Sequence, residues 1–226
     1  LIENLPIPKS QVIIIDEAQR IYSDQLEKIV DFITSERGNC IFSYDKLQTL
    51  AKWEEERDID GKINKISPLK IYKLSEKIRT NKEIAVFIKM LFNSTRSLNL
   101  SSKGNIEINY FYNLDDAKTY LESLDGNAWE VLRFTPSQYR KEHHDKYSNI
   151  YGKTSHKVIG QEFDGVAVTV DQYFTYDKNG ELFYRGGAYY YPVKMLFQNI
   201  TRARKKVNLV IINNEEVLNR CMQILK

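Results

Sequence analysis

Short apolar runs alternate along the chain with stretches in which apolar residues recur at helical spacing. Residues 12–15 are four consecutive β-branched residues, a run typical of a strand buried on both faces of a sheet. A second strand is predicted at 39–44. Between them, a helix capped by Ser23 would bury one face, which carries Leu26, Ile29, Val30 and Ile33. The alternation predicts an α/β fold in which helices flank a parallel sheet.

The same pattern continues beyond a charged, apolar-poor stretch at 54–65, which is a candidate domain boundary. Thr80 and Glu83 form a capping box, which predicts a helix that buries Ile84, Phe87, Ile88 and Leu91. Further strands are predicted at 70–74, 106–112, 129–134, 166–170 and 207–212.

Turn and cap residues delimit the last elements. Asn179-Gly180 lies between two aromatic runs and predicts a hairpin of residues 173–176 against 182–184. Pro192 suits the first turn of one helix, and Asn214 suits the start of the final helix.

Composition indicates a folded protein and limits its partners only weakly. Of the 226 residues, 42% are hydrophobic and 28% are charged, which is enough to bury a core. The net charge of +3 permits contact with a polyanion without arguing for one. No apolar run is long enough to span a membrane, so no membrane partner is expected. Cys40 and Cys221 lie in apolar stretches; a disulfide stays open, but core thiols in a reducing cytoplasm are the simpler interpretation. Because the chain opens on Leu1 rather than Met, we expect a longer parent protein.

Two adjacent carboxylates, Asp16 and Glu17, follow the first apolar run. Open α/β sheets bind ligands at the carboxyl ends of their strands. At that place Asp16 could hold Mg²⁺ through water, and Glu17 could orient and deprotonate an attacking water molecule. The alternative is that the two residues cap the following turn. After the next strand, Gln48 could hydrogen-bond a γ-phosphate or the attacking water, although a polar turn explains it equally well.

Five segments, in this order, resemble the motifs of superfamily-one helicases. Asp16–Gln19 resembles motif II (Walker B), and 45–48 resembles motif III. Arg79, within 76–81, resembles the motif IV arginine. Residues 154–164 and 199–204 resemble motifs V and VI. The set is similar to the UvrD/Rep-like group and, more closely, to Schlafen-like DNA/RNA helicase-type ATPases.

The resemblance implies a fold, cofactors and partners. It implies a RecA-like parallel sheet with flanking helices, with residues 1–60 as the remainder of an incomplete first domain and 61–226 as the second. It also implies ATP and Mg²⁺ as cofactors, single-stranded DNA or RNA as a partner, and contact with the N-terminal half of the same parent protein.

The resemblance also implies roles for single residues near the nucleotide. Arg79 and Arg202 would act as arginine fingers, because the planar guanidinium neutralises charge on phosphate oxygens. The alternative for Arg202 is a solvated basic turn. Gly160 and Glu162 would face the ribose and phosphates of the nucleotide.

Three further residues would face the nucleic-acid strand. Thr154 and His156 belong to the segment that resembles motif V. Trp53 lies where UvrD-like helicases carry an aromatic residue that stacks on a base, and packing over the rim of the first domain is its alternative.

The chain departs from the family pattern at its phosphate-binding loop. Residues 152–154 mimic the end of that loop, but Tyr147 stands where its first glycine is required. We therefore expect the chain neither to hold ATP tightly nor to hydrolyse it alone. His143 and His144 lack companion cysteines at zinc spacing and are expected in a solvated loop. The run 189–191 is expected to consist of core or partner-facing tyrosines rather than nucleic-acid contacts.

The function that combines these features is ATP hydrolysis coupled to movement on single-stranded DNA or RNA. Two alternatives stay open: a non-catalytic module for nucleic-acid binding or partner docking, and an ATPase switch in a defence or signalling system.

Overall fold

The computed structural model describes residues 12–35, 38–45, 48–73, 80–100 and 104–226. The chain divides into two compact units, Leu1–Leu74 and Ser75–Lys226. Among the described residues, none of the helices combines the length and apolar character needed to cross a lipid bilayer.

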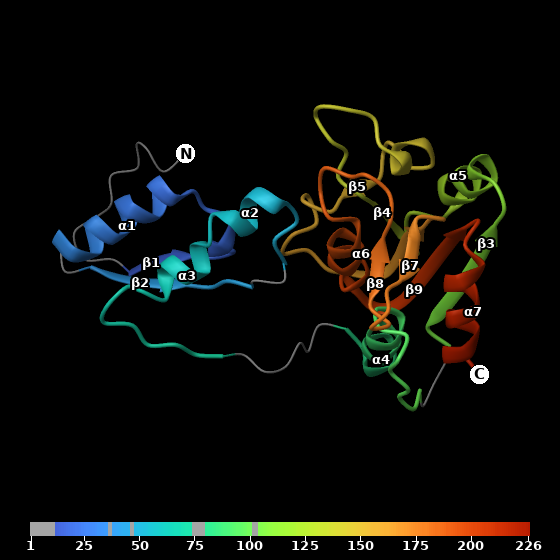
Figure 1. The fold of residues 1–226 in the computed structure, drawn as a ribbon, viewed down its shortest axis with the longest axis horizontal. Helices are drawn as coiled ribbons and strands as arrows, with labels where there is room; N and C mark the ends of the chain where they lie inside the picture. Colours follow the sequence, from blue (N-terminus) through green and yellow to red (C-terminus); the bar gives the residue numbers. More distant parts are fainter. Residues whose placement is uncertain (1–11, 36–37, 46–47, 74–79, 101–103) are drawn as a thin grey trace. The chain divides into compact units, whose positions relative to one another are not determined.

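The first unit contains a small parallel sheet and short helices (Figure 1). Its elements are β1 (Val12–Ile15), η1 (Ala18–Arg20), α1 (Ser23–Ser35), β2 (Asn39–Phe42), α2 (Lys52–Glu56) and α3 (Ile59–Ile63). Strands β1 and β2 pair in parallel, with Val12 opposite Asn39 and Ile15 opposite Phe42. The strand at 12–15 and the helix that follows it are thus confirmed, with Ser23 as the first residue of the helix.

One face of the β1–β2 sheet covers the core of this unit, and the other face is open. Ala18, Leu26, Ile59 and Ile63 form the buried cluster, against which Ile15 and Phe42 pack. On the opposite face Val12, Ile14 and Ile41 remain 50%, 69% and 55% exposed. The prediction that residues 12–15 are buried on both faces is therefore wrong for this chain.

Helix α3 belongs to the core of the first unit. Its residues Ile59 and Ile63 are each 1% exposed. The stretch 54–65 looked like a boundary because charged residues separate its few isoleucines, but those isoleucines lie on the buried face of a helix. The first unit thus continues past residue 60 to Leu74.

The second unit is built on a five-stranded sheet in which every neighbouring pair is parallel, in the order β3-β9-β6-β4-β5. This arrangement confirms the predicted α/β class with a parallel sheet and flanking helices. The strands are β3 (Ile106–Phe111), β4 (Glu130–Arg133), β5 (Lys153–Thr154), β6 (Phe163–Val170) and β9 (Ala203–Ile212). The helices are α4 (Lys82–Leu91), α5 (Leu114–Ser123), η3 (His143–Lys146), α6 (Pro192–Ile200) and α7 (Glu215–Ile224).

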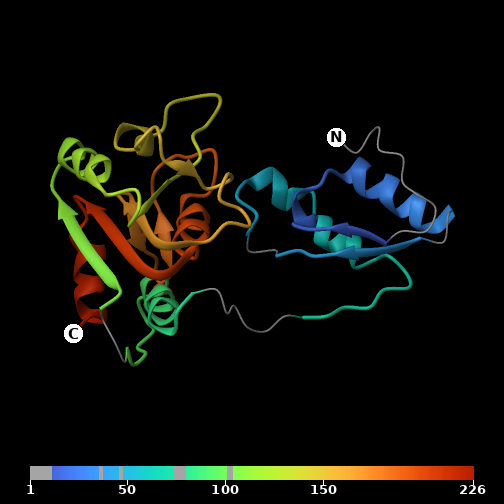
Figure 2. The ribbon, with the colours of Figure 1, turned by 180° about the vertical axis from the view of Figure 1, so that it is seen from behind.

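Strands β6 and β9 form the buried centre of this sheet. Every residue of Val166–Val170 except Thr169 is fully buried, and Thr169 is 8% exposed. Because successive strand residues face opposite sides, both faces must be covered. Helix α5 packs Ala117 and Leu121 against β6 and β9, while α4 and α6 also contact β9, as Figures 1 and 2 show from two sides.

Helix α4 has the predicted buried face but a different cap. Ile84, Phe87, Ile88 and Leu91 are buried, as expected. The N-cap is Asn81 rather than Thr80, and its Oδ1 accepts the Ile84 N–H at 2.9 Å. Glu83 instead accepts hydrogen bonds from the backbone and side chain of Asn105. The predicted capping box is therefore wrong, because a second capping residue follows Thr80 directly.

For the remaining elements, the outcome depended on how strong the local sequence pattern was. The hairpin is confirmed as β7 (Phe174–Tyr176) against β8 (Leu182–Tyr184), with Gly180 at φ +76°. Residues 70–73 form no strand. Helix α5 was not predicted, because Ala117 and Leu121 are its only buried residues and carry little periodic signal.

Candidate functional site

The two carboxylates predicted to do chemistry lie directly after β1. The backbone of Glu17 is left-handed, at φ 53° and ψ 40°, which is uncommon outside glycine. Hydrogen bonds on both sides fix this turn: Ser43 N–H donates to Ile15 O at 2.9 Å, and Ala18 N–H donates to Ser43 O at 2.8 Å. Backbone strain held in this way clusters at functional sites. Asp16 is exposed, and the Glu17 side chain is 25% exposed.

Gln19 connects this turn to the end of the next strand. Its Nε2 donates to Glu17 Oε2 at 2.6 Å, and its Oε1 accepts the Asp45 N–H at 3.2 Å. Gln19 is 2% exposed, so its amide is held in place by both bonds. In the sequence, Gln19 stood out only as the last residue of the segment that resembles motif II. The signal that could have identified it was its place two residues after a carboxylate.

Arg20 makes a second connection between the same two strand ends. Its NH2 donates to Gln48 O at 2.7 Å, and its NH1 lies 3.5 Å from Glu54 Oε1. The buried Glu54 also accepts the N–H groups of Leu50 and Ala51. Neither Arg20 nor Glu54 was predicted as a site residue from the sequence. Their separation of 34 residues leaves no local pattern that could have paired them.

Gln48 is 9% exposed and belongs to this network. Its Nε2 donates to Asp45 Oδ2 at 3.0 Å. The structure therefore brings together four of the residues predicted to act on a nucleotide or in its supporting motif: Asp16, Glu17, Asp45 and Gln48. They gather at the carboxyl ends of β1 and β2, the ligand-binding edge of a parallel sheet.

Trp53 takes part in a cation–π stack that sequence analysis did not foresee. The Arg57 Cζ lies 4.3 Å from the centre of the Trp53 ring and 3.8 Å from that of Tyr22. Such contacts contribute roughly 0.5–1 kcal/mol at exposed sites. The tryptophan is thus positioned by a neighbouring guanidinium as well as by packing.

In the second unit, Thr154 and His156 lie where β5 ends. Thr154 is 8% exposed and pairs with Arg133 of β4. The His156 N–H donates to Thr135 Oγ1 at 3.2 Å, and the His156 Nδ1 lies 2.7 Å from the same oxygen. The ring of His156 also contacts Tyr190, with centroids 4.7 Å apart. Three loops, after β4, after β5 and before α6, therefore meet at this histidine.

Gly160 and Glu162 lie in the loop between β5 and β6. Gly160 has φ +75° with open space where a Cβ would be, so its backbone angle rather than crowding favours glycine. Glu162 is exposed. Gln161 closes the loop, because its Nε2 donates to Lys157 O at 2.7 Å.

Arg202 is 3% exposed, in contrast to a solvated basic turn. Its Nε donates to Gln198 O at 3.2 Å, and its NH1 donates to Gln161 O at 3.5 Å. The residue thus connects α6 with the loop that carries Gly160. Its neighbour Lys205 is exposed and forms a 2.8 Å ion pair with Asp164, which lowers the pKa of that carboxyl.

Arg79 lies outside the described residues, but the chain that follows it is placed. Thr80 Oγ1 donates to Thr201 O at 3.3 Å, and Asn81 N–H donates to Arg204 O at 3.3 Å. The segment after Arg79 therefore runs beside residues 201–205, which flank Arg202.

His143 and His144 belong to a buried polar network, so the predicted solvated loop is wrong. His144 is 1% exposed, and its Nε2 lies 2.9 Å from the buried Glu142 Oε2. His143 Nε2 lies 4.0 Å from Asp171 Oδ2, and burial lowers the pKa of this histidine. Asp171 accepts the Tyr147 hydroxyl at 2.9 Å, and burial raises the pKa of its carboxyl. The sequence suggested a solvated loop because it does not reveal that Asp171, far along the chain, lies close to His143.

Asp16 fits a role in holding Mg²⁺. Magnesium is usually bound through one or two carboxylates, with water and phosphate oxygens as its other ligands. An exposed carboxylate beside Glu17 meets that requirement. Within the described ranges, no three residues of the His, Cys, Asp and Glu types gather into a closed metal site.

A family model described as the Schlafen group 3 DNA/RNA helicase domain matches residues 1–151 of the 226. The matched segment includes Asp16, Glu17, Gln48, Trp53 and Arg79, and it ends before Thr154. No curated protein matches the chain.

Proposed function

The chain belongs to the Schlafen group 3 DNA/RNA helicase-domain family, and on that premise we propose that it is part of an ATP-driven motor that moves on single-stranded DNA or RNA. The observation that carries the proposal is the hydrogen-bonded link from Glu17 through Gln19 to Asp45. It gives the first unit an oriented carboxylate at the ligand-binding edge of its sheet. We assign this unit to the remainder of a first RecA-like domain and the second unit to the second RecA-like domain.

Glu17 is the proposed general base. The Gln19 amide donates to Glu17 Oε2 and restrains the carboxylate, and Oε1 would accept the proton of an attacking water. Asp16 would hold Mg²⁺, which neutralises charge on the phosphates when it is bound. Gln48 would contact the γ-phosphate or the water, and the bond that its amide makes to Asp45 ties that contact to the next strand end.

Arg202 and Arg79 are the proposed arginine fingers. Backbone carbonyls of Gln198 and Gln161 accept hydrogen bonds from the Arg202 guanidinium and orient it. A fixed, planar cation suits charge spread over equatorial phosphate oxygens. Gln161 adjoins Gly160 and Glu162. A movement of Arg202 would therefore shift the loop that is proposed to face the nucleotide.

The open face of the β1–β2 sheet supports the proposal that a further segment of the same parent packs there. Val12, Ile14 and Ile41 are more than half exposed on adjacent strands. A contiguous apolar surface of this kind marks an interaction site. We propose that the covering segment also carries the phosphate-binding loop, without which the chain would not turn over ATP.

The decisive experiment separates ATP binding from turnover at Glu17. In the parent protein, Glu17→Gln removes the base but keeps the shape and the hydrogen-bonding oxygen, so ATP binding should persist while turnover falls at least about 100-fold. Gln25→Glu, a substitution of the opposite kind on α1, is a control that should leave both unchanged. Turnover within a few-fold of wild type in Glu17→Gln would show that Glu17 is not the base.

A further inference from the structure

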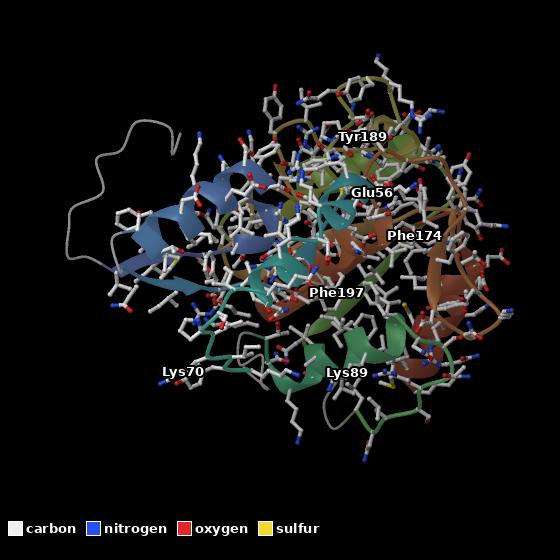
Figure 3. All side chains as sticks on the ribbon, turned by 60° about the vertical axis from the view of Figure 1, so that its left-hand side comes forward. Glu56, Lys70, Lys89, Phe174, Tyr189 and Phe197 are labelled. Carbon is white, nitrogen blue, oxygen red and sulfur yellow. The ribbon has the colours of Figure 1, made fainter. Side chains whose placement is uncertain are left out.

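Four aromatic rings form a continuous chain on the second unit. The ring centroids of Tyr139 and Tyr189 are 5.2 Å apart, those of Tyr189 and Tyr190 are 4.9 Å apart, and those of Tyr190 and His156 are 4.7 Å apart. The rings come from three loops, after β4, after β5 and before α6. Figure 3 labels Tyr189. We call Tyr139, Tyr189 and Tyr190 the tyrosine platform.

Two of the three rings of the platform, Tyr139 and Tyr189, are exposed, and Tyr190 is partly buried. Tyr139 is 77% exposed and Tyr189 is 36% exposed, whereas Tyr147 and Tyr184 are 2% and 8% exposed. Of the two positions expected for residues 189–191, core or partner-facing, the exposure of Tyr189 favours the partner-facing one. Adjacent exposed aromatic rings are costly to keep in water, which points to a ligand that covers them.

A buried carboxylate holds the platform in place from beneath. Glu142 Oε1 accepts the Tyr189 N–H at 2.5 Å, and Glu142 Oε2 pairs with His144 Nε2 at 2.9 Å. The Glu142 side chain is only 1% exposed, and a carboxylate is buried only where such partners satisfy it. These bonds join the loop after β4 to the loop before α6, so the rings are positioned before any ligand arrives.

Cationic side chains flank the exposed rings. Arg140 follows Tyr139 and is 62% exposed, with its Nε 3.8 Å from Glu142 Oε1. Lys141 and Lys157 are also exposed, and Lys157 follows His156 directly. An apolar protein partner would not require this charge, whereas a ligand with both π faces and phosphates would use rings and cations together.

We propose that the tyrosine platform stacks the bases of single-stranded nucleic acid, with Arg140 and Lys141 contacting its phosphates. The proposal rests on the proposed function and deepens it, because it extends the nucleic-acid path from His156 to Tyr139. Stacking needs unpaired bases, so the platform selects single strands over duplexes and tolerates any base sequence.

The test measures binding of a fluorescent single-stranded oligonucleotide of mixed sequence to the full chain, by anisotropy, with DNA and RNA versions. Tyr139→Ala and Tyr189→Ala should each weaken binding by about 5- to 100-fold, the range expected for loss of one stacked base. Tyr139→Phe keeps the ring and should bind like wild type. Tyr112→Ala is the matched control, because Tyr112 is also 77% exposed but follows β3 at the opposite edge of the sheet. Equal melting temperatures would establish that the variants are folded.

The outcomes separate this inference from the proposed function. If wild type binds single strands and neither alanine variant weakens binding relative to Tyr112→Ala, the platform is overturned while the motor proposal stands. If Tyr139→Phe weakens binding as much as Tyr139→Ala, the hydroxyl and not stacking is responsible, and the inference is again overturned. If wild type binds no single strand, both proposals fail.

Discussion

Gln19 donates a 2.6 Å hydrogen bond from its Nε2 to Glu17 Oε2. The same amide accepts the Asp45 N–H, so one buried side chain is hydrogen-bonded both to the proposed base and to the segment that follows the next strand. A nucleotide that drew Glu17 toward it would therefore pull on Asp45 and, through Asp45, on Gln48. The link offers a physical route from chemistry to strand movement in the first unit.

Loss of this link should impair turnover more than ATP binding. In the parent protein, Gln19→Leu keeps the side-chain volume but removes both hydrogen bonds, so the Glu17 carboxylate loses its fixed plane. We expect kcat to fall about 10- to 100-fold with KM for ATP changed less than about threefold. Steady-state kinetics measure this split. A parallel rise in KM with unchanged kcat would assign Gln19 to binding instead.

Substitution of Arg202 should lower the rate of ATP hydrolysis and leave the affinity for nucleic acid unchanged. Arg202→Ala is expected to lower the ATPase rate of the parent by about 10³-fold, as loss of an arginine finger does. Arg204→Ala is the matched control, because Arg204 lies two residues away and is exposed. Equal loss of oligonucleotide affinity and ATPase rate in Arg202→Ala would contradict the assignment.

Substitutions of Trp53 and Arg57 should distinguish a base-stacking role of Trp53 from a packing role. Trp53→Ala should weaken single-strand binding about fivefold or more, while Trp53→Phe retains a π face and most of the affinity. Arg57→Ala removes the cation over the Trp53 ring and should cost about 1 kcal/mol of stability without lowering affinity. Oligonucleotide titration and thermal unfolding measure the two effects. Unchanged affinity in Trp53→Ala would leave Trp53 as a packing residue.

A substitution on the open face of β1 should change the stability of the chain and of its parent protein by different amounts. Ile14 is 69% exposed, so Ile14→Asp should change the melting temperature of the chain by less than about 2 °C. If a further segment covers this face, the same substitution should destabilise the parent by about 3 kcal/mol, because it buries a charge. Equal, small effects in both proteins would exclude a covering segment at Ile14.

The sequence predicted elements well where the signal was local and periodic. The run 12–15, the buried face of α4 and the hairpin around Gly180 all follow from spacing and turn chemistry over fewer than a dozen residues. Helix α5 escaped detection because only Ala117 and Leu121 are buried. The burial of strand 12–15 was predicted wrongly. β-branched residues favour a strand, but they do not show whether other elements pack on both of its faces.

The contacts between the predicted site residues were harder to predict than the choice of residues. Asp16 and Glu17 were predicted as site residues from the strand end and the order of motifs, but the contacts that position Glu17 come from Gln19 and Arg20. Those contacts reach Asp45 and Glu54, which only the folded chain brings near. The contacts of the tyrosine platform could not be predicted for the same reason, because the run at 189–191 does not reveal its contacts with Glu142 and Tyr139.

The central claim is that the chain belongs to a motor driven by ATP and engaged on a single strand. The most direct measurement is the rate of ATP hydrolysis by the parent protein with and without single-stranded DNA or RNA. We predict that one of these nucleic acids stimulates hydrolysis at least about tenfold, and that Glu17→Gln abolishes the stimulated rate. Hydrolysis indifferent to both nucleic acids would contradict a motor and favour an ATPase switch, and absence of hydrolysis would reduce the chain to a binding module.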